Sequence, residues 1–477
     1  MRGSRAAGIV CLSIFGIVSW VGYETSGQAP RARAAVQTAA TIPLGGSLPG
    51  ISASAFAAAK ANFKAAEGLA DGLGPIFNER ACGNCHANGA TGGAGENIER
   101  RFGRFVNGGF DPLASEGGSL RQLFSVGNFN NPNLPPQNRG KCQAGNPTLC
   151  CVPVEVEPDS ATVRNRGRLT TPLFGLGLVD AMPDSFFDGL AAAQPAAIRG
   201  LVRRVPIVFP NVQDPSQVIG QMRVGRFGWK AAIPTLQQFA ADAYLNEMGI
   251  TTQSCFLGTS INDFATESAP NGVAEPVGCD DLAPFQPPDV VAATGIPVNT
   301  DDAVGTCASG LTQVQDDLAN FFAFSTFLAP PGPDATDRSD TGSINRGSAL
   351  FTQVGCNGCH VRTAFVTPPS PPTGVPGNFS FHPFSDFLVH DMGSLGDGVG
   401  VNPGDTVAQA RGMRTAPLWG LKVRNHLLHD GRVTDVATAV KQHDGQAATA
   451  KNAFNALSSS SQHDIVQFVR SIGYDTL

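Results

Sequence analysis

Two short segments carry the residues with the clearest chemistry. Each is a Cys-x-x-Cys-His motif, at Cys82–His86 and at Cys356–His360. Two thiols about one helical turn apart can add to the vinyl groups of a haem, and the adjacent imidazole can reach the iron from the same side. A zinc site would need a further Cys/His cluster nearby, and a dithiol centre would need a strand-turn-helix setting. No His lies between the two motifs. Two haems c are therefore predicted, attached through Cys82, Cys85, Cys356 and Cys359 and ligated by His86 and His360.

The sixth coordination position of each iron depends on the other His and Met residues. All eight histidines are His86, His360, His382, His390, His426, His429, His443 and His463. The region after the first motif therefore has no second His, and its Met182, Met222 and Met248 lie in apolar stretches where core packing is the commoner role. An open or water-bound first iron is expected. Three residues could close the second iron: Met413, Met392 and His390.

Short amphipathic helices are expected to position these motifs. Helical patterns run over residues 53–69, 235–247 and 462–472, so the fold is predicted to be mainly α. Phe77 and Phe351 each lie five residues before the first Cys of a motif. A helix or turn there would place both rings against a haem edge.

Parts of the sequence occur twice. Pro172–Leu176 and Pro417–Leu421 differ by one Phe/Trp exchange, and Trp229-Lys230 ahead of Thr235 is matched by His429-Asp430 ahead of Asp435. One structural unit used twice is therefore expected. The duplicated segments contain Trp229 and Trp419, which could relay electrons between the haems or belong to an aromatic core.

The 477 residues are enough for two domains with large insertions. Residues 1–35 are predicted to be a signal peptide or an N-terminal anchor, because two arginines precede an apolar run. Residues 36–328 and 343–477 are predicted to be the two haem domains, joined by a Pro/Gly/Asp-rich linker. Loops without regular structure are expected at 128–145, 277–305 and 368–377.

Composition narrows the partners and the compartment. The net charge is −6 and Lys and Arg form no cluster beyond short pairs, so nucleic acid is not expected as a partner. An even set of cysteines lies between the motifs and could form disulfides in an oxidising compartment or remain as buried thiols. These cysteines are Cys142, Cys150, Cys151, Cys255, Cys279 and Cys307. A periplasmic location is predicted, with membrane contact only if the N-terminal segment stays uncleaved.

The motifs resemble the di-haem oxidoreductase family of peroxidases and thiol oxidoreductases, which is similar to bacterial di-haem cytochrome c peroxidases. The resembling segments are residues 74–86, 171–180, 226–230, 246–251, 388–393, 414–421 and 429–432. The resemblance implies two cytochrome-c-like domains with long loop insertions, hydrogen peroxide as substrate, and a small periplasmic electron-donor protein.

The resemblance also implies site residues. It favours Met413 as the distal ligand of the second haem, with Met392 and His390 as rivals. An acid/base Glu is implied as well, but no motif chooses between Glu96, Glu99 and Glu116. An interdomain calcium ion is possible in such a protein, although its ligands cannot be assigned.

The predicted function is a periplasmic di-haem c peroxidase in which the second haem relays electrons to the first. Two alternatives remain. The first is an electron-transfer cytochrome without peroxidase activity, which would have two six-coordinate irons. The second is an oxygenase or protein-oxidising enzyme on the same scaffold.

Overall fold

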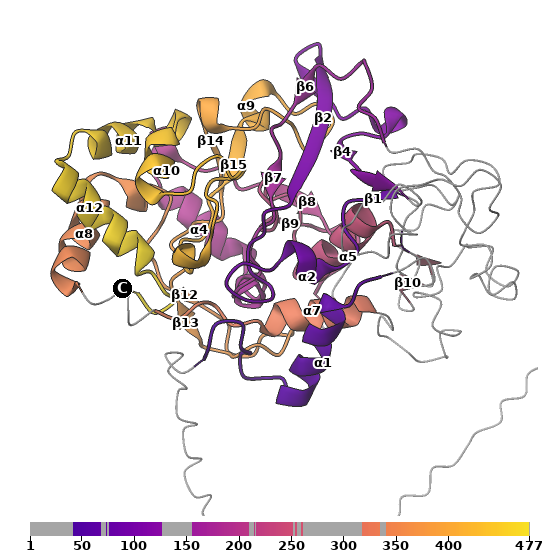
Figure 1. Cartoon of the computed structure of the whole chain (residues 1–477), viewed down its shortest axis with the longest axis horizontal. Helices are drawn as coiled ribbons and strands as arrows, with labels where there is room; N and C mark the ends of the chain where they lie inside the picture. Colours follow the sequence, from indigo (N-terminus) through magenta and orange to yellow (C-terminus); the bar gives the residue numbers. More distant parts are fainter. Residues whose placement is uncertain are drawn as a thin grey trace, which may run out of the picture. The chain divides into compact units, whose positions relative to one another are not determined.

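Helices make up 36% and strands 14% of the residues described by the structure, a computed structural model (Figure 1). It describes residues 42–67, 73, 76–125, 155–208, 214, 216–250, 253–254, 259–260, 317–333 and 340–476, all within the unit Ala39–Leu477. The fold is therefore mixed and mostly helical, so the helical expectation is confirmed, although it did not include the strands.

The α-helices are α1 (Ala53–Lys64), α2 (Cys82–Cys85), α3 (Leu176–Asp180), α4 (Asp184–Ala193), α5 (Leu236–Met248), α7 (Asp317–Phe327), α8 (Thr341–Gln353), α9 (Val407–Ala410), α10 (Val436–Gln442), α11 (Ala448–Asn455) and α12 (Ser459–Arg470). Short 3-10 helices are η3 (Ala114–Glu116), η5 (Ala196–Ile198), η7 (Cys356–Gly358), η8 (Gly393–Leu395), η9 (Leu421–Val423) and η10 (Gly445–Ala447). In Figure 1, α8 lies beside α12 and α1 lies beside α7.

The strands are β1 (Ile76–Phe77), β2 (Ile98–Val106), β3 (Gly109–Asp111), β4 (Leu120–Arg121), β5 (Phe124–Ser125), β6 (Val163–Arg164), β7 (Arg168–Leu169), β8 (Arg204–Pro206), β9 (Met222–Val224), β10 (Gln253–Ser254), β11 (Thr259–Ser260), β12 (Phe365–Val366), β13 (Ser380–Phe381), β14 (Val389–Asp391) and β15 (Gly412–Arg414). All pairings are antiparallel, and β2 pairs in turn with β7, β4, β6 and β3.

The lead-ins to the two motifs differ. Phe351 lies in α8, as expected, and is 2% exposed. Ile76 and Phe77, however, form β1, which pairs with β5, so the expected helix or turn at this point is wrong. The partner strand lies almost fifty residues further along the chain, and a strand this short depends on its partner more than on its own residues.

The predicted repeat is confirmed in local structure. Thr235 caps α5, because its side chain accepts a hydrogen bond from Gln238 N (3.1 Å), and Asp435 caps α10 by accepting from Thr438 N (2.8 Å). Caps of this kind stabilise a helix start by about 1 kcal/mol.

The turns before these caps also match. Isolated bridges join Phe227 to Ile233 and Leu427 to Val433. The residue after each first bridge position has a left-handed backbone, with φ +72° at Gly228 and φ +68° at Leu428. The two turns therefore have the same backbone path, one in each repeat. We call the predicted haem regions, residues 36–328 and 343–477, the first unit and the second unit.

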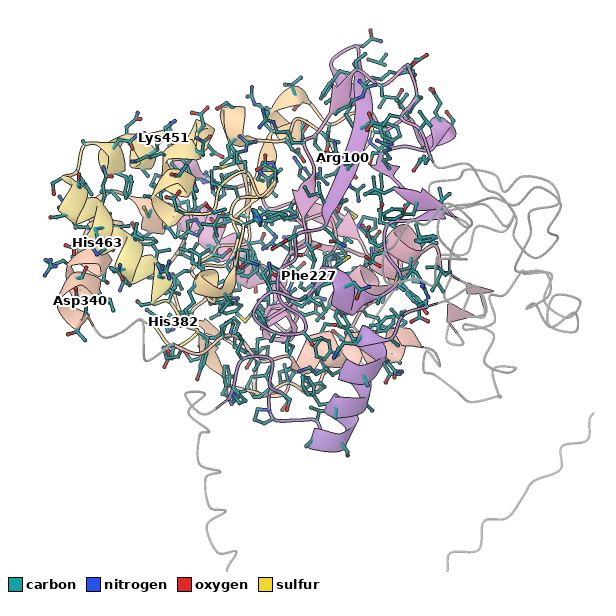
Figure 2. The ribbon with its side chains drawn as sticks, viewed as in Figure 1. Arg100, Phe227, Asp340, His382, Lys451 and His463 are labelled. Atoms are coloured by element: carbon teal, nitrogen blue, oxygen red, sulfur yellow. The ribbon has the colours of Figure 1, made fainter. Side chains whose placement is uncertain are left out.

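Apolar clusters form the core around each motif. One cluster gathers Phe63, Phe77, Phe174 and Phe227 near the first motif, and Figure 2 shows Phe227 among crowded side chains. A second cluster combines residues of both units. It includes Val179 and Phe187 of the first unit and Phe351, Phe384 and Trp419 of the second.

Two crossed backbone hydrogen bonds join the units. Leu169 N of the first unit donates to His429 O (2.6 Å), and Arg414 N of the second donates to Trp229 O (2.7 Å). Leu169 lies three residues before Pro172, and Arg414 lies three residues before Pro417. The two bonds are therefore equivalent under the internal repeat.

A buried lysine adds a side-chain clamp between the units. Lys230 Nζ of the first unit donates to Ala410 O (2.6 Å) and Gly412 O (2.8 Å), and it lies 2.6 Å from Asp397 Oδ1. The three acceptors match the three protons of an ammonium group. The Lys230 and Asp397 side chains are 2% and 1% exposed. Burial lowers the pKa of Lys230 to about 8 despite the Asp397 charge, so the amine remains mainly charged at neutral pH.

Several other expectations can be compared with the fold. Residues 368–377 contain no helix or strand, as predicted. The loops at 128–145 and 277–305, the N-terminal segment 1–35 and the six cysteines between the motifs lie outside the described residues. In the described part of the chain, no helix has the length and apolar character needed to cross a bilayer. The proposed boundaries at 328 and 343 stay predictions.

We expect Lys230→Met to lower the free energy of unfolding by about 3–5 kcal/mol, because it removes one partner of a buried ion pair and leaves two carbonyls without a donor. The measurement is urea denaturation of the haem-loaded protein. The exposed Lys441 provides the control, since Lys441→Met should stay within about 0.5 kcal/mol of the parent. Equal stability of both variants would contradict the clamp.

Candidate functional site

The second motif faces an apolar cavity of about 340 Å³. Cys356, Cys359 and His360 contribute to its wall together with Met413. A pair of thiols, an imidazole and a thioether around one apolar cavity is a set of groups that fits a covalently bound haem.

Both motif histidines have a defined tautomer. His360 Nδ1 lies 2.9 Å from Phe384 O, and His86 Nδ1 lies 3.2 Å from Gly93 O. A carbonyl oxygen only accepts, so Nδ1 carries the proton in each ring. In His360 this leaves Nε2 with its lone pair, whereas the His86 ring has a second hydrogen bond, to the Thr171 backbone. Desolvation lowers the pKa of each ring to about 4, which keeps the imidazole neutral. Both rings therefore fit the role of an iron ligand.

The motif thiols do not have the character of a redox dithiol. All four cysteines are free and half-buried. Burial raises the pKa of Cys356 to about 12 and also raises that of Cys85, where Glu247 adds to the effect. Reactive dithiol centres have lowered thiol pKa values instead. The environment of these cysteines thus agrees better with haem attachment.

A set of equivalent hydrogen bonds surrounds the two motifs. Gly93 and Phe384, which accept from the motif histidines, lie six residues before Glu99 and His390 respectively. Two further pairs of backbone bonds match in the same way, because their acceptors are separated by the same number of residues as Gly93 and Phe384. They are Leu173 N to Gly92 O (2.8 Å) with Leu418 N to Pro383 O (2.9 Å), and Thr170 N to Asn97 O (3.4 Å) with Thr415 N to Leu388 O (3.0 Å).

The repeat assigns a counterpart to each residue beside the second motif. In the second unit β14 pairs with β15, which sets His390 opposite Met413. In the first unit β2 pairs with β7, which sets Glu99 opposite Arg168. Arg168 therefore occupies the position that Met413 occupies in the second unit. A guanidinium cannot take the place of a thioether as an iron ligand.

Arg168 was missed in the sequence, although a signal for it exists. Arg168 lies four residues before Pro172, and Met413 lies four residues before Pro417. The equal distance of Arg168 and Met413 from the repeated Pro-Leu segments is therefore a signal visible in the sequence alone.

The structure separates the three acid/base candidates. Glu96 and Glu116 are exposed and accept from Asn425 and Ser160, respectively. Glu99 is about one-quarter exposed, at 26%, and pairs with Arg101 and Arg168.

Arginine charges dominate the environment of Glu99. Burial raises its pKa, but the charges of Arg101 and Arg168 outweigh burial, so the pKa is lowered overall. Two residues before it, the Asn97 side-chain amide donates to Cys85 Sγ (3.1 Å).

Two further carboxyl groups of α5 belong to these surroundings. Burial, together with the charge of Glu99, raises the pKa of Asp242 to about 6 and that of Glu247 to about 7. Glu247 also accepts from the Asn78 side chain (2.8 Å). The helical pattern of α5 did not distinguish these residues from ordinary surface carboxylates.

The two tryptophans have different surroundings. Trp229 is half-buried, lines the cavity and donates through Nε1 to Leu169 O (2.7 Å). Its ring meets that of His429 edge-on, with centroids 6.2 Å apart. Trp419 is 1% exposed and packs against Phe381 in the core.

The rival ligands of the second unit also line the cavity. Met392 is half-buried, whereas His390 is buried, with Nε2 2.9 Å from Asp386 Oδ2 and Nδ1 3.6 Å from Cys359 Sγ. Burial lowers the pKa of His390, but Asp386 and Cys359 raise it to about 10 overall. Both ring nitrogens are therefore engaged.

The methionines of the first unit also differ from one another. Met182 and Met248 are 1% and 3% exposed, so their expected role in the core is confirmed. Met222 is 52% exposed, in β9, so the same expectation is wrong for it. The strand has an exposed face that the apolar composition of the segment did not reveal.

One group of possible metal-binding side chains occurs in the described ranges, and it consists of Cys359, Asp386 and His390. Sulfur and imidazole are not the oxygen donors that calcium prefers. The calcium ion stays a prediction without assigned ligands.

Comparison with protein families decides the wider relationship. Residues 156–273 and 289–472 match the family described as "di-haem oxidoreductase, putative peroxidase". The chain belongs to this family. The di-haem family implies two haems, and its matched region contains the second motif but begins after the first.

Curated proteins and solved structures do not narrow the relationship further. No curated protein matches the chain. Among solved structures, one similar chain is a hydrazine synthase from Kuenenia stuttgartiensis pressurised with xenon, at 17% identity and a TM-score of 0.22. The match covers 34% of this chain and 58% of that one, so the present chain spans little more than half of that protein's length. A TM-score this low does not establish a shared fold.

We expect Cys82→Ala/Cys85→Ala and Cys356→Ala/Cys359→Ala each to remove half of the covalently bound haem, because each pair supplies the thioether bonds of one haem. The measurement is the haem absorbance of denatured, acid-extracted protein. The exposed Asn84, between the first two cysteines, offers a control in Asn84→Ala. Full retention of haem by either double variant would disprove the assignment of that motif.

Proposed function

We propose that the chain is a periplasmic peroxidase-type oxidoreductase with two cytochrome-c-like haem regions, whose first haem reacts with hydrogen peroxide and whose second haem relays electrons. When bound, a haem supplies an iron that exchanges single electrons and takes small ligands at any free coordination position. The single observation that carries the proposal is the pairing of Glu99 with Arg168 where the second unit has His390 and Met413.

This difference implies a division of labour between the units. The second unit offers a thioether beside His360, and Met413 is favoured over His390 because both nitrogens of that ring have other partners. The first unit offers an acid and a guanidinium instead. An iron held by His86 alone would keep one face free for peroxide, in agreement with the lack of any other His in the first unit.

Glu99 has the properties of the acid/base group. Its lowered pKa makes it a carboxylate at neutral pH, ready to accept a proton from hydrogen peroxide. Reduction of one hydrogen peroxide to two waters consumes two electrons and two protons. Asp242 and Glu247, with pKa values of about 6 and about 7, are nearby groups that can hold and return protons near neutral pH.

Electrons would come from a small periplasmic donor protein by way of the second unit. Trp229 is the better placed of the two tryptophans, since it lines the cavity and contacts His429. Trp419 lies in the core and has a packing role that accounts for it. Export would depend on residues 1–35, which serve as a signal or an anchor.

We expect azide to bind one haem of the oxidised protein, and this haem should be lost in Cys82→Ala/Cys85→Ala. Met413→Ala should open the second haem, so that two equivalents of azide bind and the low-spin signal decreases. The measurement is low-temperature EPR combined with optical titration. Met392→Ala is the control and should bind one equivalent. Azide binding at neither haem of the parent protein would instead support an electron-transfer cytochrome.

We expect Glu99→Gln to lower peroxidase turnover by about 10²–10⁴-fold, because it removes the proton acceptor. Since the pKa of Glu99 is lowered, the acid limb of the parent's pH profile should lie below the ordinary range of a Glu. The exposed Glu116 provides the control in Glu116→Gln, which should keep normal turnover. Unchanged turnover in Glu99→Gln, with circular dichroism confirming its fold, would remove Glu99 from this role.

A further inference from the structure

The guanidinium of Arg168 is buried and only partly paired. Its side chain is 7% exposed. Nε donates to Asp397 Oδ2 (2.7 Å), and Nη1 lies 3.5 Å from Glu99 Oε1. Nη2 is buried and has no hydrogen-bond partner among the described residues. Buried polar groups without partners are uncommon in proteins, and each calls for an explanation such as a catalytic role or a bound water or ion.

The surrounding residues hold this guanidinium in one orientation. One carboxylate oxygen of Asp397 accepts a hydrogen bond from Arg168 Nε, and its other oxygen pairs with Lys230 Nζ. Glu99, on the neighbouring strand, takes Nη1. Two carboxylates therefore fix the planar group from two sides, and Nη2 is the edge that they leave available. A donor fixed in this way needs no reorganisation when a ligand arrives.

The position of Arg168 identifies the ligand that it would meet. Under the internal repeat it is the counterpart of Met413, which shares a cavity with His360 and both attachment cysteines. The repeat thus gives Arg168 the strand position that, in the second unit, faces the cavity at the motif. Arg168 thus combines a free donor, a positive charge and a neighbouring carboxylate, which together suit a small ligand that becomes negatively charged.

We propose that Arg168 is a catalytic residue of the first unit, whose Nη2–H donates to a small anionic ligand such as hydroperoxide. This inference rests on the proposed function. Hydrogen peroxide transfers one proton to the Glu99 carboxylate, the O–H bond breaks and its electron pair stays on the oxygen. The products are a hydroperoxide anion, which Arg168 stabilises, and a neutral Glu99 carboxylic acid. No oxidation or reduction occurs in this step.

The test uses the complete haem-loaded protein and two probes, fluoride and azide, titrated optically in the oxidised state. Arg168→Leu should weaken fluoride binding by about 10- to 100-fold, the effect of losing one charge-assisted hydrogen bond. Arg168→Lys retains the positive charge beside Asp397 but lacks the additional N–H donors of the planar guanidinium, so it should also bind fluoride more weakly. The exposed Arg166 is the matched control, and Arg166→Leu should leave the affinity unchanged.

A second variant tests the position independently of affinity. Arg168→Met places a thioether where the second unit has Met413, so the first haem should become low-spin and stop binding azide. A first haem that stays open in this variant would overturn the placement of residue 168. Parent-like fluoride affinity in both Arg168→Leu and Arg168→Lys would overturn the role of Nη2. These failures are distinct from a parent protein that binds neither probe, which would disprove the open first iron itself.

Discussion

The crossed backbone hydrogen bonds from Leu169 to His429 and from Arg414 to Trp229 are the constraint on which the haem surroundings depend. Each bond ties the strand of one unit to the turn of the other. The residue before each donor is Arg168 in one unit and Met413 in the other, so each unit helps to hold the strand that carries this side chain in its partner. Backbone bonds do not depend on side-chain identity. The two units could therefore diverge in chemistry while their geometry was kept.

The buried charges extend this constraint from one unit to the other. Glu99, Arg168, Asp397 and Lys230 alternate in sign, and the series ends on the carbonyls beside Met413. Burying such charges is costly, so their net contribution to stability is small compared with their effect on position. A shift of Asp397 would move both Arg168 and Lys230. The same carboxylate therefore constrains Arg168 of one unit and, through Lys230, the strand of Met413 in the other.

Sequence reasoning found the parts of the site that depend on local spacing. The two haem motifs, the repeated Pro-Leu segments and the helix after Thr235 follow from neighbouring residues. The strand pairing that opposes Glu99 and Arg168 joins positions 69 residues apart, and no local pattern indicates it. The same limit explains why β1 was expected as a helix or turn. Glu99 could not be chosen over Glu96 and Glu116, because its environment comes from β7 and from Asp397.

The contacts between the two units affect the order in which the chain can fold. Arg168 and Asp397 are 229 residues apart in sequence. The acceptor of the Leu169 N–H, His429 O, lies still later in the chain. Contacts of such long range close slowly. During synthesis, the first motif would therefore emerge and remain accessible before its final neighbours were made. Haem could be attached there before the surrounding wall closed, and removing the last quarter of the chain would leave the first haem region without one of its sides.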